Sequence, residues 1–218
     1  MTRFLFISFF MLMLYPLTVL CQSVNPKGSL FVDVTIPTNE RNRAFDRTME
    51  GLFHGGIGYQ YNVFKGLTVG AGASYSFFVT NRVEFNSTIG TGGTHLAGGH
   101  VRLGFERFTT DRVSIYSGVK AGFANIIVFS DSNTVKLNGP FQVGSFFLSP
   151  QIEVNVLTET GSPSAFSFIV GYSWYFKEYN ASFMSRQFFP GYIDELSQGY
   201  IRFLNLGFGY KHYFGNNL

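Results

Sequence analysis

Eight segments of the chain alternate bulky apolar residues with small or polar ones, one residue at a time. Because side chains of a β-strand point alternately to its two faces, this spacing predicts strands with two unlike faces. Six of the segments are 9 to 12 residues long, the length that a tilted strand needs to cross a bilayer, and two are 7 residues long. They cover residues 30–36, 53–63, 67–77, 100–106, 113–123, 148–156, 166–177 and 204–214.

The two faces differ in size as well as polarity. One face is apolar and rich in aromatic rings, which make up 18% of the chain, and the other is rich in glycine and serine. A soluble β-sandwich or lipocalin-like barrel would turn its apolar face inward. Small residues instead suit the cramped interior of an eight-stranded barrel, and bulky rings suit lipid. Only 13% of residues are charged, which also favours a membrane protein over a soluble one. The chain is therefore predicted to be all-β, an eight-stranded antiparallel up-and-down transmembrane β-barrel.

The connections between these segments alternate between short and long. Outer-membrane barrels have short periplasmic turns and long external loops, so the alternation supports the same fold. The short connections are 64–66, 109–112 and 158–163, and the long ones are 38–50, 80–95, 125–139 and 178–198.

The N-terminus has the pattern of a secretory signal. Arg3 precedes an apolar run over 4–14, and the run is too short for a membrane helix. We therefore expect a signal peptide over 1–21 and a barrel domain over 22–218. Cys21 could instead be a lipidation site, although Leu20 is not the small residue that such sites prefer. If Cys21 is cleaved off, the mature chain has no cysteine for a disulfide, a nucleophile or a metal.

The leader, the eight segments and the aromatic-rich end of the chain resemble the small OmpA-like and OmpX-like outer-membrane barrels. Residues 36–52 and 55–59 are similar to β-barrel domains of Bacteroidota outer-membrane proteins. Gly209, His212 and Phe214 resemble the signal read by the barrel-assembly machinery, with His212 standing where an apolar residue is usual. The resemblance implies a bacterial outer-membrane location, with outer-membrane lipid around the barrel and the assembly machinery as a partner during insertion.

Charged residues of both signs fall at inward positions of the predicted strands. Such a set can neutralise itself and fill a narrow lumen, and the alternative is a path for ions or protons. Arg107 and Arg202 point outward, but both lie at predicted strand ends, where a long side chain can reach the interface. The predicted lumen charge network is Asp33, Arg102, Glu106, Lys120, Glu153, Lys177 and Lys211.

The sequence offers little that indicates catalysis or a cofactor. His54 and His100 share inward parity, but no third ligand for a metal is visible, so we expect neither metal nor cofactor. The His-x-Ser pattern of lipid A deacylases is absent, and we expect no enzyme, although a triad from distant strands stays open. Lysine and arginine are scattered, which argues against nucleic acid despite a pI near 9.0.

These features predict a structural or accessory outer-membrane barrel that recognises an envelope protein through its long loops. The alternatives are a narrow porin-like channel for small solutes and, less favoured, a lipid-modifying enzyme. The fourth long loop is the best candidate for a partner surface, because exposed aromatic residues of this density need something to pack on. They could equally fold over the barrel mouth as a cap. The residues in question are Tyr179, Phe183, Arg186, Phe188, Phe189 and Tyr192.

Overall fold

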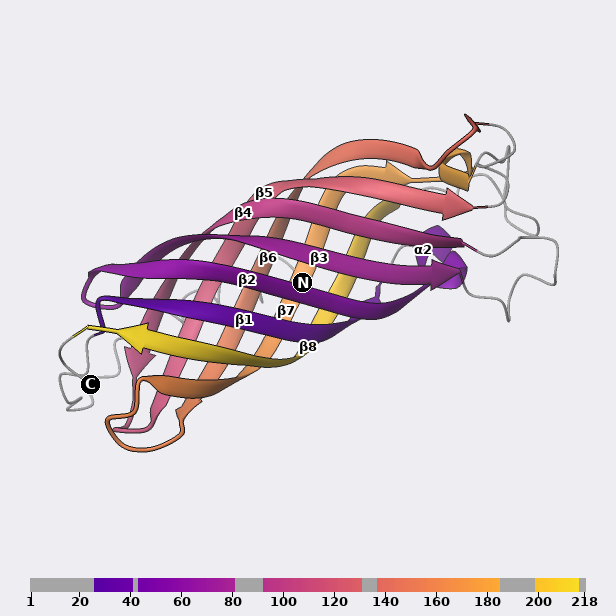
Figure 1. The fold of residues 1–218 in the computed structure, drawn as a ribbon. Coiled ribbons are helices and arrows are strands. Elements are labelled where there is room, and N and C mark those ends of the chain that lie inside the picture. Colours follow the sequence, from indigo (N-terminus) through magenta and orange to yellow (C-terminus); the bar gives the residue numbers. More distant parts are fainter. Residues whose placement is uncertain (1–25, 41–42, 81–91, 131–136, 185–198, 216–218) are drawn as a thin grey trace, which may run out of the picture.

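The chain forms a closed barrel in which each strand pairs with its sequence neighbours and the last strand pairs with the first (Figure 1). The computed structural model describes residues 26–40, 43–80, 92–130, 137–184 and 199–215. The prediction of an eight-stranded antiparallel barrel is confirmed. The strands are β1 (Gly28–Asn39), β2 (Met49–Phe64), β3 (Leu67–Thr80), β4 (Gly92–Phe108), β5 (Val113–Ser130), β6 (Phe141–Leu157), β7 (Ser164–Tyr179) and β8 (Gly199–Phe214).

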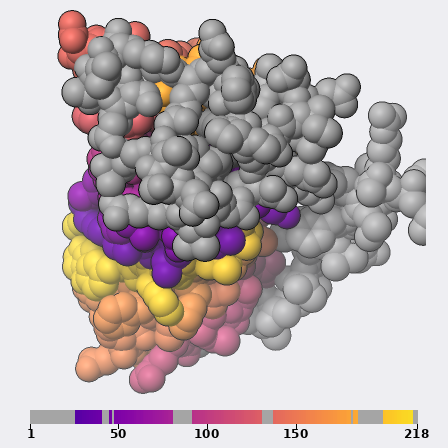
Figure 2. Space-filling model, turned by 90° about the vertical axis from the view of Figure 1, so that its right-hand side faces the viewer, coloured from indigo at the N-terminus to yellow at the C-terminus, as the bar shows by residue number. Residues whose placement is uncertain are grey.

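The barrel closes through a long seam between β1 and β8. Residues pair antiparallel from Gly28 opposite Phe214 to Asn39 opposite Phe203. Figure 2 shows β8, in yellow, directly against the indigo and purple of the first strands. Because β1 and β8 satisfy each other's backbone groups, neither is left as an open edge.

The short connections lie at one end of the barrel, where β8 also ends (Figure 1). The β2–β3 connection is a two-residue turn in which Lys65 and Gly66 have φ values of 43° and 93°. Two-residue hairpins favour turns with positive φ at both positions, because their twist matches that of the strands. Glycine at the second position meets this requirement without strain.

Several strands are longer than the sequence predicted. β4, β5 and β6 span 17, 18 and 17 residues. β4 and β5 extend into stretches that were expected to be loops, and β6 begins at Phe141, whereas its predicted start was residue 148. The cause is that the apolar face of these strands changes from the outside of the barrel to the inside. In these extensions the apolar side chains point inward, as for Leu96, Ile126 and Val128, all of which are buried. The sequence-based prediction assumed that the apolar face points outward along the whole strand, and it therefore ended the strands too early.

Two short helices lie at the end with the long connections. α2 (Arg43–Thr48) leads into β2, and the 3-10 helix η1 (Ala181–Met184) follows β7. In the part of the chain that the structure describes, no helix has the length and apolar character needed to span a membrane.

Candidate functional site

The barrel wall turns large apolar side chains outward along every strand. Val101, Phe208 and Phe146 are 61%, 63% and 68% exposed, and many other outward residues are comparable. The residues between them point inward and are buried, as the burial pattern of β1 shows. The outside of the molecule is thus apolar and the middle of its interior is polar, which is the reverse of a soluble barrel.

An ionic layer fills the part of the lumen nearer the short turns. Arg102 Nη2 lies 2.8 Å from Glu153 Oε1, and Lys211 Nζ lies 2.9 Å from Glu153 Oε2. Lys211 also forms a 3.2 Å ion pair with Glu106. All four side chains are buried and come from β4, β6 and β8. The ion pairs therefore connect strands that are not neighbours in the sheet.

Glu106 accepts hydrogen bonds from several strands in addition to the ion pair. Its Oε1 accepts from Tyr213 at 2.6 Å, Ser114 at 2.9 Å and Asn155 at 3.0 Å. Its Oε2 accepts from Gln60 at 2.7 Å. These donors replace the water that a buried carboxylate loses, which is what allows the charge to remain in the interior.

A second ion pair lies further along the lumen. Lys120 Nζ on β5 is 2.8 Å from Asp33 Oδ2 on β1. In a ring of eight strands β1 and β5 are opposite each other, so this pair crosses the barrel. Three cations face three anions in the two groups of ion pairs, and their formal charges cancel.

Aromatic rings separate and hold the cations. The Arg102 guanidinium carbon is 4.4 Å from the centre of the Phe31 ring and 3.8 Å from that of Tyr116. Tyr116 fits because Gly104 and Gly118 are paired beneath it, and a β-carbon at either would overlap its ring. Arg102 is thus held by two aromatic rings and one carboxylate.

The structure brings six of the seven predicted lumen charges into these contacts and leaves out Lys177. That assignment was wrong, because the Lys177 side chain is exposed. Trp174 pairs with Arg202 and Glu178 pairs with Tyr200, so three residues of β7 lie opposite one residue of β8. Tyr175 and Tyr179 keep the inward parity of the strand and are buried, whereas Lys177, in the bulge between them, does not.

Sequence reasoning omitted the neutral partners of the charges. Tyr116, Gln60, Asn155 and Tyr213 all contact the ionic layer. Their inward parity could have identified them. Tyr116, Asn155 and Tyr213 each lie an even number of residues from an inward charge on the same strand, and Gln60 has the inward parity of β2.

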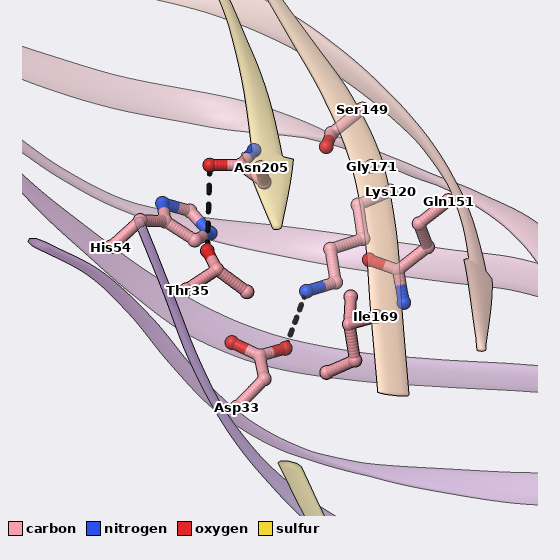
Figure 3. A pocket seen from close by; sticks show the side chains of 9 residues that line it. All are labelled: Asp33, Thr35, His54, Lys120, Ser149, Gln151, Ile169, Gly171 and Asn205. Carbon is pink, nitrogen blue, oxygen red and sulfur yellow. Dashed lines mark hydrogen bonds and ion pairs between the residues drawn. The ribbon is translucent and has the colours of Figure 1, made fainter. Parts of the chain in front are cut away.

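A small cavity lies beside the Lys120–Asp33 pair (Figure 3). Thr35 donates a 3.4 Å hydrogen bond to Asn205 at one side of it. The space is sufficient for about one water molecule, so it does not accommodate a substrate. Its lining consists of Asp33, Thr35, His54, Lys120, Ser149, Gln151, Ile169, Gly171 and Asn205.

The histidines of β2 and β4 have different partners. His54 Nδ1 is 2.7 Å from Ser76 Oγ inside the barrel, and His100 packs edge-on to Phe147. His95 points outward, where its Nδ1 is 2.5 Å from the Tyr75 hydroxyl. Over the described residues, no group of three or more His, Cys, Asp or Glu side chains could hold a metal ion.

Above the polar interior, the lumen at the long-loop end is filled by an apolar core. We call this core the cap; it includes residues of β-strands and of both short helices. Phe45 of α2 packs edge-on against Phe78 and Tyr179 at 5.0 and 5.1 Å. The buried members are Phe45, Met49, Phe78, Leu96, Ala124, Ile126, Val128, Phe147, Tyr175, Tyr179, Phe183, Met184, Ile201 and Phe203.

The cap includes part of the predicted partner surface of the fourth loop. Tyr179 and Phe183 are 0% and 2% exposed, and their rings are 5.1 and 4.7 Å from those of Phe45 and Phe141. For these two residues the prediction of an exposed partner surface was wrong, and the cap alternative describes them. Arg186, Phe188, Phe189 and Tyr192 lie outside the described residues.

One hydrogen-bonded serine and histidine lie on the outer wall. Ser164 Oγ is 3.3 Å from His212 Nδ1 and 2.7 Å from the Tyr210 hydroxyl. Catalytic serines also need a group that orients the histidine and donors for an oxyanion. The Ser164 amide already donates to Ser162, and in the described chain no carboxylate is hydrogen-bonded to His212.

No family model and no curated protein matches the chain. Among solved structures it is similar to Neisserial surface protein A, with 10% identity, a TM-score of 0.50 and coverage of 86% of this chain and 97% of that one. It is also similar to the outer membrane protein OprG from Pseudomonas aeruginosa, with 13% identity, a TM-score of 0.49 and coverage of 86% and 97%. A third is Ail of Yersinia pestis in complex with sucrose octasulfate, at 11% identity, a TM-score of 0.42 and coverage of 84% and 97%. These neighbours are small outer-membrane β-barrels, and at such identities the likeness is one of fold.

Proposed function

We propose that the chain is an integral barrel of a bacterial outer membrane that acts as a structural or accessory protein, with its lumen closed. The observation that carries this proposal is the exposed apolar wall around a buried ionic interior. In water such a wall would be a very large exposed apolar patch, whereas lipid covers it at no cost.

The height of the apolar wall supports the membrane location. Arg202 and His212 are ten residues apart on β8, and between them Leu204, Leu206, Phe208 and Tyr210 face outward. A rise of about 3.3 Å per residue and a tilt of about 40° give a band of about 25 Å, the height expected for outer-membrane barrels.

Three layers inside the barrel support a closed lumen. Below the ionic layer, Phe108, Leu157, Ala165 and Tyr213 form a small apolar cluster at the short-turn end. The ionic layer and the cap lie above it. Ions would have to displace paired charges and then cross apolar packing, and both steps are costly.

The side chains of the serine–histidine pair on the outer wall also favour an accessory role over an enzymatic one. Ser164 and His212 lack the additional groups that a lipid-modifying enzyme requires, within the described residues. A partner protein would contact residues 185–198 of the fourth loop or the apolar wall itself. The assembly machinery would recognise β8 during insertion, as the resemblance of the end of the chain implies.

Reconstitution tests the proposal in two steps. Folded outer-membrane barrels resist SDS at room temperature and change mobility on heating, and we expect this shift after refolding into lipid vesicles. Planar bilayers that contain the same protein should then show no steady conductance. A folded barrel with stable channels would favour the narrow pore. Failure to enter vesicles, with a monodisperse protein in buffer without detergent, would contradict the membrane location.

A further inference from the structure

Four basic side chains follow one another along the rim of the barrel at its short-turn end. Lys27 precedes β1, Lys65 lies in the β2–β3 turn, Arg107 is near the end of β4, and Arg112 lies in the β4–β5 turn. Lys27, Lys65 and Arg112 are exposed, and Arg107 is half-buried. We call these four residues the basic arc.

Backbone and side-chain hydrogen bonds hold three of these segments side by side. The Asn62 amide donates to the Lys27 carbonyl at 2.9 Å, and Asn62 Oδ1 accepts from the Gly66 amide at 3.2 Å. The Glu106 amide donates to the Gly66 carbonyl at 2.8 Å. The residues next to Gly66 and Glu106 are Lys65 and Arg107, so these two basic residues lie on adjacent backbone segments.

The arc borders the apolar wall directly. Phe64 and Phe105 are 64% and 49% exposed, and Lys65 Nζ lies 5.2 Å from the centre of the Phe64 ring. A cation immediately beyond an exposed aromatic residue is at the depth where lipid headgroups meet the hydrocarbon. Asp111 and Glu159 are the acids on the turns of this rim, leaving the described rim with two more basic than acidic residues.

We propose that the basic arc binds the phosphate groups of anionic phospholipids in the leaflet at the short-turn end of the barrel. This inference rests on the proposed membrane location and adds to it the class of lipid. Phosphodiesters accept hydrogen bonds from lysine and arginine, and their acyl chains would cover Phe64 and Phe105. A membrane surface with anionic lipid attracts each nearby cation, whereas a zwitterionic surface does so weakly.

Lipid selectivity measured with spin-labelled phospholipids tests the proposal. The folded protein is reconstituted in phosphatidylcholine vesicles, and the fraction of motionally restricted label is compared for phosphatidylglycerol and phosphatidylcholine. We expect phosphatidylglycerol to be preferred severalfold, up to about fivefold for each cation engaged. The preference should fall as salt screens the charges.

Two sets of variants distinguish the arc from a general charge effect. K65Q/R107Q/R112Q should abolish most of the preference, and D111N/E159Q, on the same rim, should increase it. Lys65→Gln alone keeps the test valid if the triple variant fails to fold, and it should lower the preference measurably. An unchanged preference in Lys65→Gln and in the folded triple variant would overturn the proposal.

Inorganic phosphate at matched ionic strength identifies the source of the anion. If it removes the preference while sodium chloride does not, the arc binds free phosphate and the lipid assignment is wrong. If the protein inserts and shows equal selectivity for both lipids, the inference fails while the proposed membrane barrel stands. If it does not insert into either lipid, the proposed function itself fails.

Discussion

Lys120 on β5 and Asp33 on β1 form a 2.8 Å ion pair that joins opposite sides of the barrel. Both side chains are buried, at 5% and 3% exposure. Among the described ion pairs, this is the single one in which either residue takes part. Removing one member would therefore leave the other as an uncompensated charge in the interior.

The first prediction concerns this pair. Asp33→Ala should lower the free energy of unfolding by about 3 to 5 kcal/mol, because Lys120 loses its carboxylate. The double variant Asp33→Leu with Lys120→Met should recover most of that loss, since neither charge remains buried. Urea unfolding in lipid vesicles measures both. Equal losses in the single and double variants would show that the pair does not act as a unit.

The second prediction compares two tyrosines on β8. Tyr213→Phe removes the 2.6 Å hydrogen bond to Glu106 and should cost about 1.5 to 3 kcal/mol, because the acceptor is charged and buried. Tyr210 faces outward and its hydroxyl contacts Ser164, so Tyr210→Phe should change stability by less than about 0.5 kcal/mol. The same urea titration distinguishes them, and similar losses would argue against the network around Glu106.

The third prediction addresses the cap. Phe45 is fully buried between Phe78 and Tyr179, so Phe45→Ala should cost about 3 to 5 kcal/mol and make the α2 segment sensitive to protease. Leu137 is 52% exposed, and Leu137→Ala serves as the control with little effect. The Phe45 variant should still not conduct, because the ionic layer lies below the cap. Channels in that variant would make the cap the main barrier.

The fourth prediction concerns orientation. Lys177, which is exposed in the β7 bulge, lies at the long-loop end, and Lys65 lies at the other end. On intact cells a membrane-impermeant maleimide should label Lys177→Cys and not Lys65→Cys, which should react only after the outer membrane is permeabilised. Lys120→Cys should stay unlabelled in both conditions, because the site is buried. Labelling of Lys65→Cys on intact cells would reverse the orientation.

The strand number and the inward charges could be predicted because a period of two fixes which face each residue occupies. The inward positions of Asp33, Arg102 and Lys211 follow from that parity alone. Lys177 could not be predicted in the same way. Lys177 lies in a bulge of β7 and is exposed, although Tyr175 and Tyr179 of the same parity are buried, and nothing in the local sequence marks the bulge.

The cap was the other feature that alternation could not assign. Ile126 and Val128 continue a period of two, but their apolar face is the inner one, whereas Val119 and Phe123 on the same strand face outward. The sequence does not mark the residue at which the apolar face of a strand changes from the outside of the barrel to the inside. For the same reason, the choice between cap and partner surface for Tyr179 and Phe183 depended on the three-dimensional packing.

The central claim is that the apolar wall faces lipid while the polar face is enclosed. Its most direct test is the oxygen accessibility of nitroxide spin labels placed singly at residues 204–210 of β8 in a bilayer, because oxygen concentrates in the hydrocarbon. We predict maxima at Leu204, Leu206, Phe208 and Tyr210 and minima at Asn205, Gly207 and Gly209. A profile without a period of two, or one with its maxima at residues 205, 207 and 209, would contradict the account.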